Sequence, residues 1–256
     1  MNEKLKAFER LLNIMDDLRA KCPWDKEQTF ESLRHLTIEE VYELGDSILE
    51  NDSEKIKKEL GDILLHIIFY AKIASEKNLF DIADVINREC EKLIHRHPHI
   101  YGDKVVESAE QVSRNWEQLK LKEGNKSVLE GVPASLPSMV KAMRIQEKAR
   151  SSGFDWETKD QVWEKVQEEL NEFKKEVEKG NNDKIKNEFG DLIFSLINYA
   201  RFIDVNPEEA LERTNIKFIK RFKYLEHSAN ENGKQLHDMT LTEMDKIWDE
   251  AKAKGL

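Results

Sequence analysis

The feature that most constrains this chain is an acidic pattern that occurs twice, 129 residues apart. Each copy reads EExxE, then a 15-residue spacer, then ExxD, with a glycine directly before the final aspartate. Glutamate is common on helix surfaces, so one match has little weight, whereas two copies in register indicate a duplicated unit. The first copy comprises Glu39, Glu40, Glu43, Glu59 and Asp62, and the second comprises Glu168, Glu169, Glu172, Glu188 and Asp191.

Apolar residues recur at helical spacing along nearly the whole chain. Charged residues make up 36% of the 256 positions, and only 10 are glycine and 5 proline, which suits amphipathic helices better than a sheet. The predicted fold class is therefore all-α. We expect helices from near Leu5 to before Pro23, and then over about residues 30–50, 54–76, 82–97, 107–122, 139–151, 159–179, 183–203, 207–229 and 241–254.

The repeat predicts two related helical domains, over residues 1–122 and 138–256. The segment between them, residues 123–137, breaks the helical pattern with two prolines and two glycines. Such a segment is expected to be a linker. Each half is long enough to bury a core of its own.

Composition excludes several classes of function. A net charge of −10 argues against broad binding to nucleic acid or to membranes. Cys22 and Cys90 have no CxxC spacing, which favours a reducing compartment. The N-terminus lacks the apolar core of a signal peptide, and no apolar run approaches the length of a bilayer span. We therefore expect a cytoplasmic protein without membrane or direct nucleic-acid partners.

The spacing of the acidic residues predicts that they converge. Residues three apart share a helical face, so Glu40 and Glu43 point the same way, as do Glu59 and Asp62. The turn expected at residues 51–52 lies midway between Glu43 and Glu59, roughly 12 Å from each at a rise of about 1.5 Å per residue. An antiparallel hairpin would bring the four carboxylates together, and the second copy repeats this arrangement with Glu169, Glu172, Glu188 and Asp191.

Clustered carboxylates repel one another and hold protons more tightly unless a cation joins them. Oxygen ligands favour Mg²⁺, with Mn²⁺ as a substitute, over zinc, and Mg²⁺ commonly shares its ligands with substrate phosphates. Two other interpretations compete with this one. The first is a solvated acidic face, and the second is a ferritin-like di-iron site. The di-iron site requires Glu-x-x-His, and no histidine in this chain lies three residues after a carboxylate.

A basic pair follows each acidic set. Lys92 and Arg96 in the first half match Lys217 and Arg221 in the second, with lysine and arginine four apart on one helical face. Arginine can grip phosphate with two hydrogen bonds, and lysine acts as a mobile charge. A pair of this kind is often no more than a surface feature, but its recurrence favours a polyphosphate-binding role.

Each half ends in a predicted helix that carries a tryptophan, Trp116 or Trp248. A partly buried core residue is the ordinary interpretation of such a tryptophan. The functional alternative is a stacking surface for a nucleobase. His95, His97 and His99 could suggest a metal cluster, but Pro98 between them favours a surface loop that ends a helix.

On these residues the chain resembles the MazG nucleoside triphosphate pyrophosphohydrolases over almost its full length. The acidic motif alone also occurs in related all-α enzymes such as the dimeric dUTPases. Further motifs narrow the resemblance to the two-domain form, namely CPWD at residues 22–25, RHPH at 96–99, LEGVP at 129–133, KAMRIQEK at 141–148 and GFDW at 153–156.

The resemblance implies Mg²⁺-dependent hydrolysis of a nucleoside triphosphate between its α- and β-phosphates. It implies broad base preference, a role in clearing nucleotide pools, and a homodimer that completes the helical core. A pyrimidine-specific deoxynucleotide pyrophosphatase and a non-catalytic metal-binding interaction module are the alternatives. In this family the second domain often carries the main activity.

The resemblance also assigns roles to individual residues. The metal ligands are Glu169, Glu172, Glu188 and Asp191, with Glu40, Glu43, Glu59 and Asp62 as their first-half counterparts. Lys217, Arg221, Lys92 and Arg96 bind phosphate, and Trp248 and Trp116 lie beside the base. The candidates for water activation are Glu168, Glu169 and Glu172, with Glu39, Glu40 and Glu43 in the first half.

Overall fold

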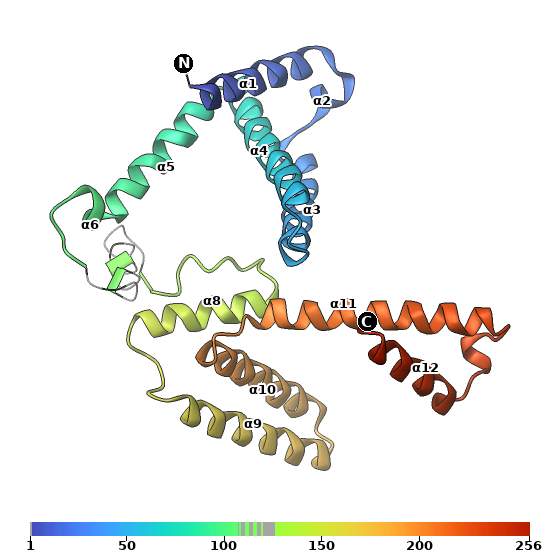
Figure 1. The fold of residues 1–256 in the computed structure, drawn as a ribbon. Helices are drawn as coiled ribbons and strands as arrows, with labels where there is room; N and C mark the ends of the chain where they lie inside the picture. Colours follow the sequence, from blue (N-terminus) through green and yellow to red (C-terminus); the bar gives the residue numbers. More distant parts are fainter. Residues whose placement is uncertain (1, 107, 109–110, 113–114, 117–118, 120–125) are drawn as a thin grey trace. The chain divides into compact units, whose positions relative to one another are not determined.

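A computed structural model describes residues 2–106, 108, 111–112, 115–116, 119 and 126–256. All regular elements in these residues are helices, which confirms the all-α fold class (Figure 1). The chain forms two compact units, Met1–Glu107 and Ser108–Leu256. No helix within the described ranges is long and apolar enough to cross a membrane.

The helices agree closely with those expected from the sequence. The first unit contains α1 (Glu3–Lys21), α2 (Pro23–Glu27), α3 (Phe30–Leu49), α4 (Ser53–Glu76), α5 (Ile82–Arg96) and α6 (Pro98–Tyr101). The second contains α8 (Ser138–Ser151), α9 (Lys159–Lys179), α10 (Asn182–Phe202), α11 (Pro207–Glu231), a 3₁₀ turn η1 (Leu236–Asp238) and α12 (Leu241–Ala253).

The differences are confined to short elements. The sequence did not predict α2, α6 or η1, because one turn of helix is too short to show a period. The loop expected after residue 97 is therefore wrong over Pro98–Tyr101, where proline begins α6 instead of only closing α5. The helix predicted over residues 107–122 falls largely outside the described residues.

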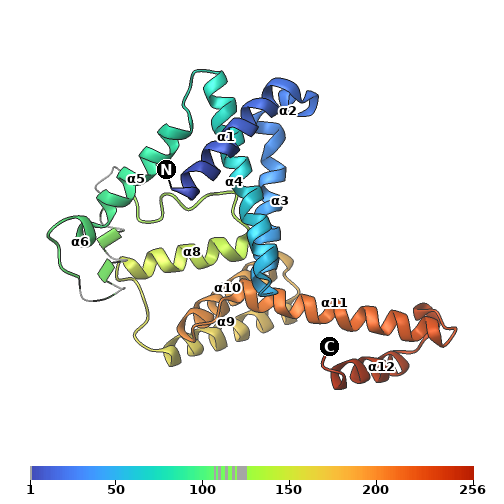
Figure 2. The same cartoon turned by 45° about the horizontal axis from the view of Figure 1, so that its top comes forward.

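Each unit contains one long antiparallel hairpin, α3–α4 or α9–α10, whose two helices lie side by side in both views (Figures 1 and 2). The hairpins begin in the same register, because Thr29 and Thr158 both form capping boxes at the start of the first helix. Asp52 and Asn181 then cap the second helix with their side chains. Each such cap is typically worth about 1 kcal/mol, so the sequence sets the helix starts locally.

The turn between the paired helices needs a left-handed residue in both hairpins. Asn51 has φ 54° and Gly180 has φ 72° at the corresponding positions. Asparagine and glycine are the residues that adopt this conformation most readily. The two turns therefore reverse the chain at the same place relative to the acidic motifs.

The first unit has a core that joins α1 to the hairpin. Its fully buried side chains come from α1, α3 and α4, and partly buried apolar residues pack around them. Truncating one such buried aliphatic side chain to alanine typically costs about 2–5 kcal/mol. The central residues are Met15, Leu33, Ile68, Phe69 and Ile73.

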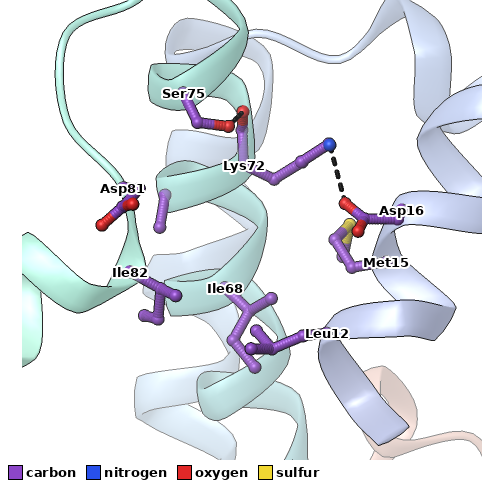
Figure 3. A pocket seen from close by; sticks show the side chains of 9 residues that line it. Leu12, Met15, Asp16, Ile68, Lys72, Ser75, Asp81 and Ile82 are labelled. Atoms are coloured by element: carbon purple, nitrogen blue, oxygen red, sulfur yellow. Dashed lines mark hydrogen bonds and ion pairs between the residues drawn. The ribbon is translucent and has the colours of Figure 1, made fainter. Parts of the chain in front are cut away.

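Polar contacts hold α1 against α4 beside this core. A small cavity of about 150 Å³ lies between α1, α4 and the start of α5. Leu12 and Ile68 lie in its wall (Figure 3). Lys72 Nζ forms an ion pair with Asp16 at 2.6 Å across the same gap. Arg19 Nε also donates to Glu76 at 3.0 Å. These contacts place α1 along the hairpin.

In the second unit, α8 packs against α10, and α11 packs against α12 and α8. Residues 126–137, which were expected to be linker, form turns that belong to this unit. The buried ammonium of Lys148 donates to the Val128 carbonyl at 3.0 Å and ties this segment to α8. The boundaries assigned from the sequence remain a prediction.

Candidate functional site

The structure brings the acidic motifs together in both hairpins. Glu40 and Glu43 from α3 and Glu59 from α4 offer carboxylate oxygens that all lie within 4.8 Å of one another. Residues Glu169, Glu172 and Glu188 form the same arrangement between α9 and α10. Three oxygens this close, from two helices, can share one cation of the size of Mg²⁺. Their role as metal ligands remains a prediction.

The remaining acidic residues of the motifs lie around these triads. Asp62 lies beside the first triad, where its charge raises the pKa of Glu40. Asp191 has the same effect on Glu188. Glu39 and Glu168 are exposed, and Glu168 pairs with Lys165 at 3.0 Å. The outer glutamate of each EExxE motif therefore faces solvent and not the center of the triad.

Electrostatics within the triads favour a bound cation. Partial burial, followed by the charges of Asp62, Glu43 and Glu59, raises the pKa of Glu40 above its ordinary value of 4.5. Burial, followed by Glu172 and then by other neighbouring carboxylates, raises the pKa of Glu188 in the same way. Ionised carboxylates at these positions repel one another, and a divalent cation relieves that repulsion. The oxygen-only donor set therefore fits Mg²⁺.

The predicted phosphate-binding pairs lie on other helices. Lys217 is exposed on α11, and Arg221 is half-buried there and donates through Nε to the Leu256 carbonyl at 2.7 Å. In the part of the chain that the structure describes, no ion pair joins either residue to the second triad. In the first unit, Lys92 pairs with Glu89, and Arg96 is half-buried. In the described part of the second unit, the carboxylates thus come together without an ion pair to Lys217 or Arg221, and the phosphate-binding role of the four cations remains a prediction.

The tryptophan predicted to lie beside a base belongs to an aromatic group between α11 and α12. The Trp248 ring lies 5.0 Å from that of Phe218, which lies 6.1 Å from that of Phe222. Trp248 is half-buried, as is Trp116. Packing explains the position of Trp248 without a ligand, and its role toward a base remains a prediction.

A pocket in the second unit was not predicted from the sequence. It has a volume of about 610 Å³ and a mostly apolar wall, within the usual range for small-molecule sites. Two of the acidic residues, Glu169 and Asp191, form part of this wall. The rest comes from α8, α9, α10 and preceding loops, namely Leu129, Ile145, Gln146, Ala149, Phe154, Asp155, Trp156, Val162, Lys165, Phe194, Ser195, Asn198 and Arg201.

The GFDW motif at residues 153–156 is the sequence feature that could have indicated this pocket. Phe154 and Trp156 of that motif lie in the pocket wall. Asp155 accepts from Arg201 Nη1 at 2.9 Å, which ties the motif to α10. The motif supported the family resemblance, but nothing in its spacing indicated that it faces the acidic residues.

The corresponding positions of the first unit are filled. Ser195 and Asn198 on α10 correspond to His66 and Phe69 on α4, which are 8% and 3% exposed. Thr37 Oγ1 lies 2.7 Å from both His66 Nδ1 and the Tyr70 hydroxyl, so this region holds a side-chain hydrogen-bond network. Burial lowers the pKa of His66. The two units therefore share their carboxylates and differ in what lies behind them.

The fold and the site define an all-α protein in which each of two units has a helical hairpin that carries a carboxylate triad. The chain belongs to the MazG family, because the MazG nucleotide pyrophosphohydrolase domain matches it twice, over residues 28–101 and 157–225. Both matches contain one complete acidic motif, in agreement with the predicted tandem arrangement.

Individual relatives extend the similarity to the whole chain. The nucleoside triphosphate pyrophosphohydrolase/pyrophosphatase MazG of Thermotoga maritima is 42% identical over 98% of this chain and 98% of its own length. The nucleoside triphosphate pyrophosphohydrolase of Escherichia coli K12 is 37% identical over 97% of this chain and 98% of its own. A crystal structure of a mazG-related protein from T. maritima, 28% identical, covers 44% of this chain and 98% of that chain, with a TM-score of 0.40.

Proposed function

We propose that this protein is a Mg²⁺-dependent hydrolase that converts nucleoside triphosphates and deoxynucleoside triphosphates to monophosphates and pyrophosphate. The observation that carries this proposal is the triad of Glu169, Glu172 and Glu188 beside an apolar pocket whose wall includes Glu169 itself. A phosphate chain at the carboxylates and a nucleoside in the pocket would lie next to each other. The names of the full-length relatives support the same reaction.

The residues that would hold the metal are Glu169, Glu172, Glu188 and Asp191, with Glu40, Glu43, Glu59 and Asp62 as the second set. Mg²⁺ held by these residues would act as a Lewis acid toward the phosphoryl oxygens and would make water a better nucleophile. In the reaction, the bond between the α- and β-phosphates breaks, and the oxygen of one water enters on phosphorus. One proton of that water passes to a carboxylate, for which Glu168, Glu169 and Glu172 are the candidates, and the hydroxyl stays on phosphorus, so that the monophosphate and pyrophosphate separate.

Glu169 has a particular position in this scheme. It is 7% exposed, and it belongs both to the triad and to the wall of the pocket. It therefore lies where the phosphates of a bound nucleotide would meet the sugar. This position supports a direction for the substrate in which the base lies toward Trp156 and the phosphates toward Glu172.

Broad base preference and clearance of unwanted nucleotides form part of the proposal. The apolar part of the wall accepts any base, because every base has an apolar face. A pyrimidine-specific enzyme needs polar groups matched to one base edge, and Gln146, Ser195 and Asn198 are the polar side chains of this wall that would have to supply them. A panel of nucleotides that includes all common bases tests this point. Equal turnover within about tenfold supports broad preference, and activity confined to pyrimidines contradicts it.

A homodimer is also part of the proposal. The helix α5 has no buried residue and exposes four apolar side chains, Val85, Ile86, Leu93 and Ile94, which are 37–43% exposed. Apolar surface of this kind is commonly covered by association. Light scattering after gel filtration gives the mass directly, and a monomer at micromolar concentration contradicts this part of the proposal.

The central experiment identifies the products. The pure full-length protein is incubated with Mg²⁺ and a nucleotide panel, and the products are separated by ion-exchange chromatography. Monophosphate and pyrophosphate in equal amounts support the proposal, and diphosphate plus phosphate, or no products, defeat it. The double variant Glu43→Ala, Glu172→Ala should lose turnover, whereas Glu178→Ala, which removes an exposed glutamate of α9 outside the triad, should retain it.

A further inference from the structure

We propose that Lys58 is a built-in counter-ion of the first carboxylate set and weakens its affinity for Mg²⁺ relative to the second set. As a result, the two sites fill at different Mg²⁺ concentrations, the second before the first. This inference rests on the proposed function, because it assumes that both sets bind Mg²⁺.

The position of the Lys58 ammonium carries the inference. Its Nζ lies 3.0 Å from Glu59, 3.6 Å from Asp62 and 3.9 Å from Glu43. Glu43 comes from α3, whereas Glu59 and Asp62 come from α4. The ammonium thus contacts carboxylates from both helices and bridges the hairpin, as a cation shared by the triad would.

The second set has no such bridge. The position that corresponds to Lys58 is Asn187, which is neutral and exposed. Among the residues that the structure describes, no ion pair joins Glu172, Glu188 or Asp191 to a cation. Glu172 on α9 and Glu188 and Asp191 on α10 therefore keep their charge available for a metal, whereas Glu169 pairs with Lys165.

Two lysines do lie near the second set, but neither bridges it. Lys165 Nζ lies 2.8 Å from Glu169 and 3.0 Å from Glu168, and all three residues belong to α9. Lys179 pairs with Glu176 at 2.6 Å, and Glu188 acts on it only through its more distant charge. Among the described residues, neither lysine forms an ion pair with a carboxylate of α10.

A metal that enters the first set must displace the Lys58 ammonium. The lysine side chain is 64% exposed and flexible, so it can swing into solvent. The cost is then the loss of its contacts with Glu43, with Asp62 and with the buried carboxylate of Glu59, together with the remaining repulsion between two cations. Exposed ion pairs are weak individually, so the dissociation constant of the first site should be raised by about threefold to tenfold and not by orders of magnitude.

The test uses Mn²⁺ as the probe, with bound and free ion measured by electron paramagnetic resonance on the full-length protein. The first site is isolated in a Glu172→Gln, Asp191→Asn background, and the second in a Glu43→Gln, Asp62→Asn background. In the first background, Lys58→Asn should tighten Mn²⁺ binding by about threefold to tenfold. In the second, Asn187→Lys should weaken it by a similar factor.

Lys57→Asn is the matched control, because it removes the same charge one position away. Lys57 is 71% exposed and pairs with Glu54, outside the carboxylate set. It should change Mn²⁺ affinity by less than about twofold, which is the effect of a screened surface charge. Thermal melts of each variant confirm that the fold is retained, and the Asn187→Lys arm tests the inference even if a Lys58 variant does not fold.

The outcomes separate this inference from the proposed function. If Lys58→Asn and Lys57→Asn change the affinity equally, or if Asn187→Lys has no effect, the role of Lys58 is refuted while the metal sites stand. If the unaltered protein binds no Mn²⁺ at either set, the proposed function itself fails. If the two sites bind Mn²⁺ with unequal affinities and Lys58→Asn makes these affinities equal, the result supports both the role of Lys58 and the proposed function.

Discussion

Filling the pocket of the second unit should block nucleotide binding without affecting the metal site. The variant Ser195→His, Asn198→Phe introduces the residues that occupy the corresponding positions of the first unit. There, His66 and Phe69 are buried beside an intact carboxylate triad, so the hairpin accommodates these side chains. Because Glu169, Glu172 and Glu188 are unchanged, Mn²⁺ binding at the second triad should stay within about twofold.

The expected rise in KM follows from the binding free energy of the base, which the filled pocket can no longer hold. The cavity of about 610 Å³ is large enough for a nucleoside. A base of roughly ten non-hydrogen atoms, at about 0.3 kcal/mol for each atom, contributes about 3 kcal/mol to binding. Since about 1.4 kcal/mol corresponds to a factor of ten, the KM for a nucleoside triphosphate should rise on the order of 100-fold.

The assay is pyrophosphate release at several substrate concentrations, together with Mn²⁺ binding to the same preparations. The matched control is Ser195→Ala, Asn198→Ala, which alters the same positions but leaves the pocket open. It should raise KM by less than about tenfold, because only side-chain hydrogen bonds of the wall are lost. If the filled variant has the KM of the unaltered protein, the nucleoside does not bind in this pocket, and the assigned direction of the substrate is wrong.

Four further predictions concern metal, protons and the core. Mg²⁺ at 100 times its dissociation constant should stabilise the second unit by about 2.7 kcal/mol. In a thermal melt this corresponds to a rise in Tm of roughly 5–10 °C. The variant Glu172→Gln should abolish this rise in Tm. Because the folded-state pKa of Glu188 is raised by burial and by Glu172, its protonated form is favoured in the fold. Its contribution to stability is therefore present below pH 4.5 and is lost as pH rises through the raised pKa, and Glu188→Gln should flatten this dependence in metal-free melts. Mg²⁺ competes with the same proton, so its apparent affinity, measured by calorimetry, should fall as pH drops through that pKa and fall less in Glu188→Gln. Leu33→Ala removes a side chain that is 1% exposed and should destabilise the first unit by about 2–5 kcal/mol in urea unfolding; a loss below about 1 kcal/mol would contradict the assigned core.

The helices and the convergence of the carboxylates could be predicted because both depend on local rules. Thr29 and Thr158 set where the first helix of each hairpin begins, and Asn51 and Gly180 set where the chain turns. With a constant rise per residue, these fixed points determine which acidic residues face one another. The spacing of EExxE and ExxD was therefore enough to predict that the carboxylates of each triad lie close together.

The pocket and the Lys58 bridge could not be predicted, because both depend on side-chain packing between elements distant in sequence. The difference between Asn198 and Phe69 is a single residue within similar apolar stretches, and its effect depends on how α8 lies against α10. Lys58 is one of many surface lysines, and only the three-dimensional contacts show that it spans two helices. Short helices such as α6 were not predicted, because four residues are too few to show the helical periodicity of apolar side chains.

The register shared by the two hairpins has a consequence for how such a duplicated chain can change over time. In each hairpin the acidic residues occupy one face, while the residues behind them contact a different neighbour, α1 in one unit and α8 in the other. A substitution behind the carboxylates in one copy leaves the other copy intact, so a pocket can open or close there while the protein keeps the other carboxylate set unchanged. Within this chain, the two copies have the same acidic residues, whereas the positions behind them differ, as His66 and Ser195 show.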